Sequence, residues 1–337
     1  MTAALEVLAA PPVAALQDAG RQGARAFGVS RGGAADPRAL TEAAALLSQP
    51  LGAALELAGP GARFRARGRM RVALTGAPMG AAIDGRPVRW MASHLMEDGA
   101  VLSLGAAGPG VYGYLSVGGG FDVPPVLNSL SVNTLAGIGA AALAGDLLPL
   151  GPDPGLEDAG FALPVEDRFS GGVIRVLDGP QTALFDPATR ERFYGSDFTA
   201  DPRSNRQGVR LARPGAPFQA AGQLSILSES IVPGDIQMTG DGTPYVLMPD
   251  CQTTGGYPRI GTVHPDDLAR VAQAAPGLVL RFRQVDRDEA LAAFARAREA
   301  EARLRSARFP LIRDPADVKD LLSYQLISGA TTGRDAI

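Results

Sequence analysis

The sequence predicts a mainly β protein of two lobes, with a few helices and a C-terminal helix. Among its 337 residues, 42 glycines and 27 prolines separate short segments rich in Val, Leu and Ile. Such punctuation is typical of many strands joined by turns. The length allows a sizeable core and favours more than one unit. The Gly/Pro-rich run from 151 to 164 is interpreted as the connection between lobes. We therefore expect an N-terminal β lobe over 1–155, a C-terminal β lobe over 165–285, and a helix and tail over 286–337.

Three segments carry helix signals. Asp36 precedes Pro37–Leu47, and a proline directly after an N-cap residue marks a helix start. Asp266 is interpreted as the N-cap of a helix that reaches Gln273. Glu289–Arg308 is rich in Ala, Glu and Arg with a partial apolar stripe, which predicts a helix over the second lobe. A shorter helix, 314–326, and a loose tail, 329–337, are expected to follow. The predicted strands are Arg71–Thr75, Val101–Leu104, Tyr112–Val117, Val173–Leu177, Gln223–Leu227, Tyr245–Met248 and Leu278–Arg283.

Composition excludes several classes of protein. The net charge of −3 gives no indication of a nucleic-acid or membrane partner. No signal peptide or apolar run long enough to span a bilayer is visible in the sequence. The single cysteine, Cys251, excludes an intrachain disulfide and indicates a cytoplasmic protein. We interpret Cys251 as a small buried apolar group rather than a nucleophile.

The scarcity of lysine and histidine narrows the chemistry. Lys319 is the only lysine, so the preceding chain has neither a Walker-A lysine nor a Schiff-base lysine. An anion held there must contact arginine, backbone N–H groups or hydroxyls. His94, His264 and one cysteine cannot form a structural zinc site, and no metal site is predicted. We interpret His264 as structural.

One loop has an unusual concentration of functional groups. Thr253 and Thr254 supply hydroxyls, and the Gly255-Gly256 pair allows positive φ angles and close approach of another group. Tyr257 precedes a proline, which favours an extended exit. The alternative is a hairpin turn with a packed tyrosine. We favour a substrate-binding loop.

Further candidates lie elsewhere in the chain. Arg21 could clamp a carboxylate or phosphate in two-point fashion, while nearby Asp18 acts as a base or an orienting group. The alternative for these two residues is a local ion pair that fixes a loop. Gln237 is the best neutral donor in the second half for a carbonyl or carboxylate. Ser30 lies in a G-x-S-x-G string, but no helix follows directly, so we do not interpret it as a nucleophile.

Several segments occur in an order that resembles one known family. They are Gln17–Gly23, Gly33–Asp36, Thr75–Ala77, Gly145-Asp146, Arg203–Gly208, Ile231–Met238, Gly242–Asp250 and Cys251–Val263. The resemblance covers roughly residues 5 to 283. With these segments the chain is similar to the carboxyltransferase family that includes allophanate hydrolase subunit 2, the carboxyltransferase region of urea carboxylase, and the C-type subunit of bacterial ATP-dependent 5-oxoprolinase. One branch of this family is described as antagonist of a kinase inhibitor.

The resemblance implies two cyclophilin-like β-barrel lobes and a subunit of a larger enzyme. The C-type subunit would work with a B-type subunit, similar to allophanate hydrolase subunit 1, and an A-type subunit to hydrolyse 5-oxoproline to glutamate. ATP would be the cofactor, bound here or mainly by the partners. Arg206 matches the family's Ser-Asn-Arg-x-Gly run. The implied catalytic residues are Asp18, Gln237 and Thr254, and the implied substrate-binding residues are Arg21, Arg206, Thr253, Gly255, Gly256 and Tyr257.

Two other activities fit the same resemblance. The chain could move a carboxyl group from carboxybiotin to urea or a related amide, with biotin carried by another chain. It could also be a non-catalytic partner of a kinase-inhibitor protein. Changes in the first half keep this last alternative open, since Asn128–Val132 and Tyr112 stand where the family usually has arginine-containing motifs, and the stretch Gly139–Leu143 is shortened.

Overall fold

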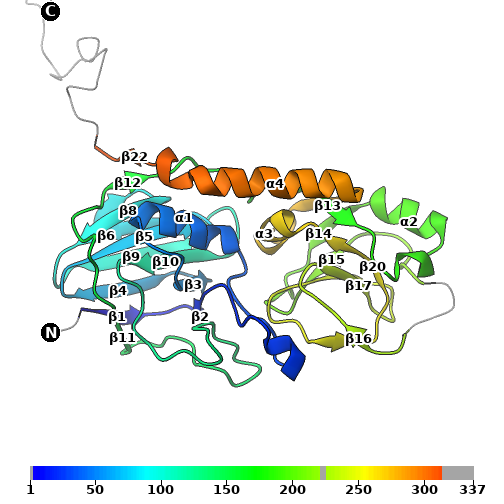
Figure 1. The fold of residues 1–337 in the computed structure, drawn as a ribbon, viewed down its shortest axis with the longest axis horizontal. Helices are drawn as coiled ribbons and strands as arrows, with labels where there is room; N and C mark the ends of the chain where they lie inside the picture. The colour runs from blue at the N-terminus through cyan, green and yellow to red at the C-terminus, as the bar shows by residue number, and fades with distance from the viewer. Residues whose placement is uncertain (1–2, 221–224, 313–337) are drawn as a thin grey trace, which may run out of the picture.

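The computed structural model describes residues 3–220 and 225–312, which form two β lobes side by side (Figure 1). The predicted helix 314–326 and the tail 329–337 lie outside the described residues. Within the described part of the chain, every helix is too short or too polar to cross a bilayer.

The first lobe consists of two mainly antiparallel sheets that face each other across one core. Phe64 and Leu102 from one sheet and Val72 and Leu115 from the other are fully buried in this core. One sheet has the order β11 (Leu147–Pro149), β1 (Ala4–Ala9), β4 (Ala62–Arg67), β9 (Val101–Ala107), β6 (Met79–Ile83) and β7 (Arg86–Val88). The other has the order β2 (Val13–Gln17), β3 (Ala54–Ala58), β10 (Gly113–Val117), β5 (Met70–Gly76), β8 (Ala92–Met96), β12 (Phe161–Ala162) and β22 (Phe309–Pro310).

The second lobe is a closed seven-stranded barrel. Phe193 packs against Phe198, Phe218 and Phe282 in its core, with ring centroids 5.1–5.5 Å apart. Pairing is antiparallel except between the first and last strands of the barrel. The barrel order is β13 (Gly172–Leu177), β20 (Arg259–Val263), β17 (Asp235–Met238), β18 (Pro244–Leu247), β15 (Gly208–Ala212), β14 (Asp197–Ala200) and β21 (Val279–Gln284). A separate two-stranded ribbon joins β16 (Glu229–Ser230) to β19 (Thr254–Gly255).

The helices lie around and between the lobes. The α-helices are α1 (Pro37–Leu47), α2 (Pro187–Tyr194), α3 (Leu268–Ala272) and α4 (Arg287–Arg303). The 3-10 helices are η1 (Ala24–Phe27), η2 (Thr182–Leu184), η3 (Pro265–Asp267) and η4 (Leu304–Ala307). The predicted bounds of α1 are confirmed, and its first residue is the proline that follows the N-cap residue Asp36.

Two local predictions are corrected by the structure. Residues 225–227 of the predicted strand 223–227 have no regular structure, and the first two residues of that strand are not described. Asp266 does not cap a helix, because its carboxylate pairs with Arg298 at 3.0 Å. His264 instead accepts the backbone N–H of Asp266 and caps η3. His264 also contacts the backbone oxygen of Ala290 in α4 at 3.0 Å, which supports the structural role expected for it.

Helix α4 spans both lobes, whereas the sequence predicted a helix over the second lobe alone (Figure 1). It begins beside the barrel, where Ala290 contacts His264. At its far end, Leu304 packs against Leu46, Leu47 and Phe161 of the first lobe. The chain then forms β22, which pairs with β12. Strand β12 itself lies in the predicted connection 151–164 and joins the first lobe's sheet. The chain therefore leaves the first lobe at β12 and returns to it at the neighbouring strand β22.

Candidate functional site

A cleft of about 720 Å³ lies between the two lobes. Its walls come from the segment 31–35 and α1 of the first lobe, from α3 of the second, and from α4. Asp18 is the one sequence-predicted site residue in this lining. The cleft is therefore bounded by both lobes and closed along one side by the bridging helix.

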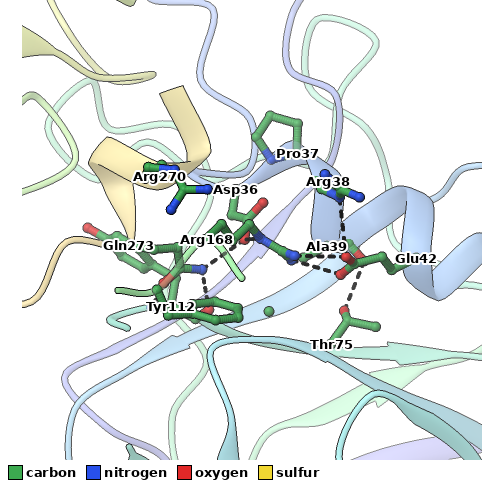
Figure 2. Close-up of polar contacts among 12 residues, drawn as sticks. Asp36, Pro37, Arg38, Ala39, Glu42, Thr75, Tyr112, Arg168, Arg270 and Gln273 are labelled. Carbon is green, nitrogen blue, oxygen red and sulfur yellow. Dashed lines mark hydrogen bonds and ion pairs between the residues drawn. The ribbon is translucent and has the colours of Figure 1, made fainter. Parts of the chain in front are cut away.

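A buried polar network beside the cleft joins Arg168, which lies between β12 and β13, to residues of both lobes (Figure 2). Arg168 donates from Nε to Asp36 at 2.6 Å and holds both carboxylate oxygens of Glu42, at 2.8 and 2.7 Å. Gln273 of the second lobe donates to the same Asp36 oxygen at 2.9 Å, and its own oxygen accepts the backbone N–H of Tyr112. Because these charges are buried and paired in two-point geometry, they hold the lobes in one fixed arrangement.

Arg206 is the centre of a second network across the lobe boundary. Its guanidinium pairs with Asp250 at 2.7 Å and with Glu56 of the first lobe at 2.5 Å, and it donates to the backbone oxygen of Gly33 at 2.7 Å. Glu56 also accepts the hydroxyl of Tyr114 at 2.7 Å. All three nitrogens of the Arg206 guanidinium are thus bonded to protein groups, and the residue predicted to bind substrate organises the lobe boundary.

Both oxygens of the Asp18 carboxylate accept hydrogen bonds from other groups of the protein. It accepts hydrogen bonds from the backbone of Gly20 and Leu130 and from the hydroxyls of Ser129 and Ser131, at 2.5–2.8 Å. Burial disfavours the charged form, but these four hydrogen bonds outweigh it and hold the pKa of Asp18 below its usual value. Asp18 is therefore ionised, and its carboxylate fixes the segment 129–131. The serines of 129–131 were not singled out from the sequence, because they lie more than 100 residues away from Asp18 along the chain.

Arg21 carries hydrogen-bond donors that the protein does not use. Only 1% of this residue is exposed, and its Nη2 donates to the backbone oxygen of Ser131. Among the described residues, its Nε and Nη1 are buried without a hydrogen-bond partner. A β-carbon on Gly32, which lines the cleft, would lie 3.2 Å from Nη1 and 3.7 Å from an Asp250 oxygen. The unused donor Nη1 of Arg21 thus lies next to the cleft wall, and Gly32 covers it.

The loop Thr253–Tyr257 forms the β19 half of the ribbon. Neither Gly255 nor Gly256 has a positive φ angle, so that expectation is wrong, because pairing with β16 keeps the segment extended. The expected close approach is confirmed at Gly255, where a β-carbon would lie 2.6 Å from Nε2 of Gln237. Tyr257 is 42% exposed, which is unlike the packed tyrosine of a simple hairpin.

Gln237 repeats the pattern seen at Arg21. Only 7% of the residue is exposed, and its Nε2 has no hydrogen-bond partner. A glycine again lies directly over the unused donor. Two residues that the sequence selected as candidates for holding oxygen atoms therefore both have buried donors available.

Contacts between the lobes, which we call the seam, link the surroundings of Arg21 to those of Gln237. Gly32 donates its backbone N–H to Pro249 at 3.1 Å, and Ser30 donates its hydroxyl to the Cys251 carbonyl at 2.9 Å. Arg25, on η1, reaches the carbonyls of Ile231 and Thr253. The sequence did not indicate Arg25, because nothing in its neighbourhood reveals partners more than 200 residues away. Burial raises the pKa of the Cys251 thiol to about 12, which agrees with its interpretation as an unreactive group.

Comparison with known proteins identifies the family of the chain. The family described as carboxyltransferase domain, subdomain A and B, matches residues 27–284. The chain belongs to this family. Within it, the C-type subunit of 5-oxoprolinase from Escherichia coli is 37% identical over 297 residues, covering 86% of this chain and 94% of that protein.

Two further members of the family extend the comparison. A protein named putative urea carboxylase, from Emericella nidulans, is 26% identical, and the match covers 86% of this chain and 25% of that protein. The crystal structure of TTHA0988 superposes with a TM-score of 0.77 at 31% identity and covers 84% of this chain. This chain spans 56% of that one.

Proposed function

We propose that this chain is the C-type component of an ATP-dependent 5-oxoprolinase and works with a B-type and an A-type subunit to convert 5-oxoproline to glutamate. The relative from Escherichia coli that bears this component's name is matched over 94% of its length. The observation that carries the proposal is the pair of unused donor sets, Nε and Nη1 of Arg21 and Nε2 of Gln237.

The chemistry of a cyclic amide requires such donors. A lactam carbonyl resists attack by water, and negative charge develops on its oxygen in the transition state. In our proposal Arg21 binds the substrate carboxylate, because its guanidinium can offer two parallel N–H groups. Gln237 and the exposed hydroxyl of Thr254 stabilise the developing oxyanion.

Substrate can reach these donors only if the backbone that covers them moves locally. The donors are shielded from solvent beneath Gly32 and Gly255, each of which lacks a side chain that would fill the space above them. A small movement of these two backbone segments is enough to admit a ligand oxygen. Such movement also lets the closed seam exclude water during the reaction.

Nucleotide binding is assigned to the partner subunits. The described residues contain no lysine, and the arginines nearest to the seam already hold carboxylates or carbonyls of the protein. ATP supplies the activation of the amide in the complex as a whole. This chain contributes binding and orientation of the substrate, and we place the complex in the cytoplasm.

Reconstitution tests the proposal. The chain is co-expressed with its A-type and B-type partners, and ATP-dependent formation of glutamate from 5-oxoproline is measured. We expect turnover by the three chains together and little by this chain alone. Full turnover by the isolated chain, or none by the complete set, contradicts the proposal. Calorimetry with Mg-ATP should show weak binding to the isolated chain.

Carboxyl transfer is the second candidate, because the matching family is described as a carboxyltransferase domain. The same buried donors could hold the carbonyl of urea and the carboxylate carried by biotin. The only lysine, Lys319, is flanked by Val318 and Asp320 and does not form a biotin-acceptor motif, so biotin must come on another chain. Urea-dependent loss of label from a carboxybiotin carrier, with no hydrolysis of 5-oxoproline, selects this activity. Absence of both reactions together with binding to a kinase-inhibitor protein selects the regulatory role.

A further inference from the structure

Arg25 is a first-lobe side chain that contacts the ribbon of β16 and β19. Its Nη2 donates to the carbonyl of Ile231 and lies 3.2 Å from the Ser230 hydroxyl and 3.5 Å from the Thr253 carbonyl. All three acceptors are uncharged oxygens. They come from both halves of the ribbon, so one guanidinium nitrogen holds the two halves at once.

A second arginine, from the barrel, holds the same ribbon. Arg259 of the barrel donates to the carbonyl of Ser230 at 2.8 Å, directly beside the carbonyl that Arg25 holds. Arg259 also pairs with Glu229 at 2.8 Å and with Asp235 at 3.0 Å. Its position is therefore fixed within the second lobe. Arg25, in contrast, makes its contact across the lobe boundary.

The ribbon held in this way lies over Gln237. The β-carbon position of Gly255 is 2.6 Å from Nε2 of Gln237 and 3.1 Å from a methyl group of Ile231. Ile231 thus contacts Gly255 through its side chain and Arg25 through its carbonyl. A displacement of Arg25 is transmitted through Ile231 to the backbone that covers Gln237.

We propose that Arg25 is a positioning residue, which sets the ribbon over Gln237 and couples the placement of Thr253–Gly255 to the arrangement of the lobes. The inference rests on the proposed function for its effect on turnover, but the contact itself belongs to this chain alone. Since a single nitrogen makes the contact, one donor at that point is sufficient. Lysine at position 25 should replace it in part, which it could not do in a two-point carboxylate clamp.

Hydrogen exchange of the isolated chain tests the positioning directly. In the ribbon, the N–H of Ile231 is bonded to Thr253 at 3.1 Å and the N–H of Ile226 to Gly256 at 2.7 Å. In Arg25→Ala, peptides that contain these amides should exchange on the order of tenfold faster. Barrel peptides from β17 and β20 should keep their rates. Arg25→Lys should give intermediate rates.

Arg31→Ala is the matched control for exchange. Arg31 lies in the same segment, but its guanidinium donates only to the carbonyl of Ala19 in its own lobe. Its loss should leave ribbon exchange unchanged. Unchanged ribbon exchange in Arg25→Ala overturns the proposal, and so does faster exchange spread equally over the barrel, because that indicates a general loss of stability.

Turnover in the reconstituted complex provides the second readout. Arg25→Ala should lower kcat by about tenfold or more with little change in KM, because substrate binding is assigned to Arg21 and oxyanion stabilisation to Gln237. Arg25→Lys should recover part of kcat. A rise in KM alone contradicts a positioning role and indicates direct contact with substrate. If the complex does not hydrolyse 5-oxoproline at all, the proposed function fails, while the exchange experiment still decides the role of Arg25.

Discussion

The side-chain nitrogen of Gln237 lies 2.6 Å from the point that a β-carbon on Gly255 would occupy. Real β-carbons essentially never come so close to another heavy atom, so position 255 can hold only glycine while Gln237 keeps its place. The position of the Gln237 side chain therefore depends on glycine at position 255. This relationship yields the first prediction.

Gly255→Ala should displace Gln237 and lower kcat/KM at least tenfold in the reconstituted complex, with little loss of stability, because the atom that must move is the end of a flexible side chain. Gly240→Ala is the matched control, because a β-carbon there has nothing within 4 Å. Steady-state kinetics and urea unfolding measure both effects. Wild-type kcat/KM in Gly255→Ala contradicts a catalytic role for Gln237.

Thr254→Ala should reduce activity without reducing stability. The Thr254 side chain is exposed, so its removal should change the melting temperature little. If its hydroxyl stabilises the oxyanion, kcat/KM should fall by an amount that corresponds to about 2–4 kcal/mol. Unchanged kcat/KM together with an unchanged melting temperature shows that the loop only connects strands.

Arg206→Ala should destabilise the whole chain. Its loss leaves Glu56 and Asp250 buried without the cation that bonds to both, and breaking a buried ion pair costs about 3–5 kcal/mol. Denaturant unfolding measures this cost. Arg203→Ala is the comparison, because the Arg203 side chain is 73% exposed and Asp201 keeps Arg210 as a partner at 2.6 Å, so the loss should cost less than about 1 kcal/mol. Equal costs for the two variants contradict the central role of Arg206.

Asp18 makes the stability of the chain depend on acid pH. Its pKa is lowered in the folded state, so its contribution is complete above the unfolded value of about 3.9 and is lost as the pH falls through the lower folded value. The stability difference between wild type and Asp18→Asn should therefore be largest near neutral pH and shrink below about pH 4. A difference that stays constant from neutral to strongly acid pH argues against an ionised Asp18.

Local signals in the sequence were sufficient for part of the fold. The bounds of α1 followed from Asp36 and Pro37, because a helix start depends on neighbouring residues. The cap of η3 was misassigned, because the sequence does not show that Arg298 takes the carboxylate of Asp266. The strand expected at 223–227 failed in its described part, since apolar composition alone does not provide a pairing partner.

The candidate site could likewise be predicted only in part from the sequence. Arg21 and Gln237 could be selected by residue type and family resemblance, and both have free buried donors. The occupation of Asp18 by Ser129 and Ser131, and the contact of Arg25 with Ile231, depend on chain segments that meet only after folding. Residue type indicates what a side chain can bind, but the fold decides which of its atoms remain available.

The pairing of β12 with β22 has a consequence for biosynthesis. These strands flank the second lobe in the sequence, so the outer edge of the first lobe's seven-stranded sheet is completed by the last described residues. A nascent chain that has emerged only as far as residue 285 therefore has an unfinished sheet edge and lacks α4. Exposed edges of this kind pair readily with other chains. The C-terminal segment must therefore emerge before the sheet edge of the first lobe is complete, and truncated products should aggregate rather than accumulate as single lobes.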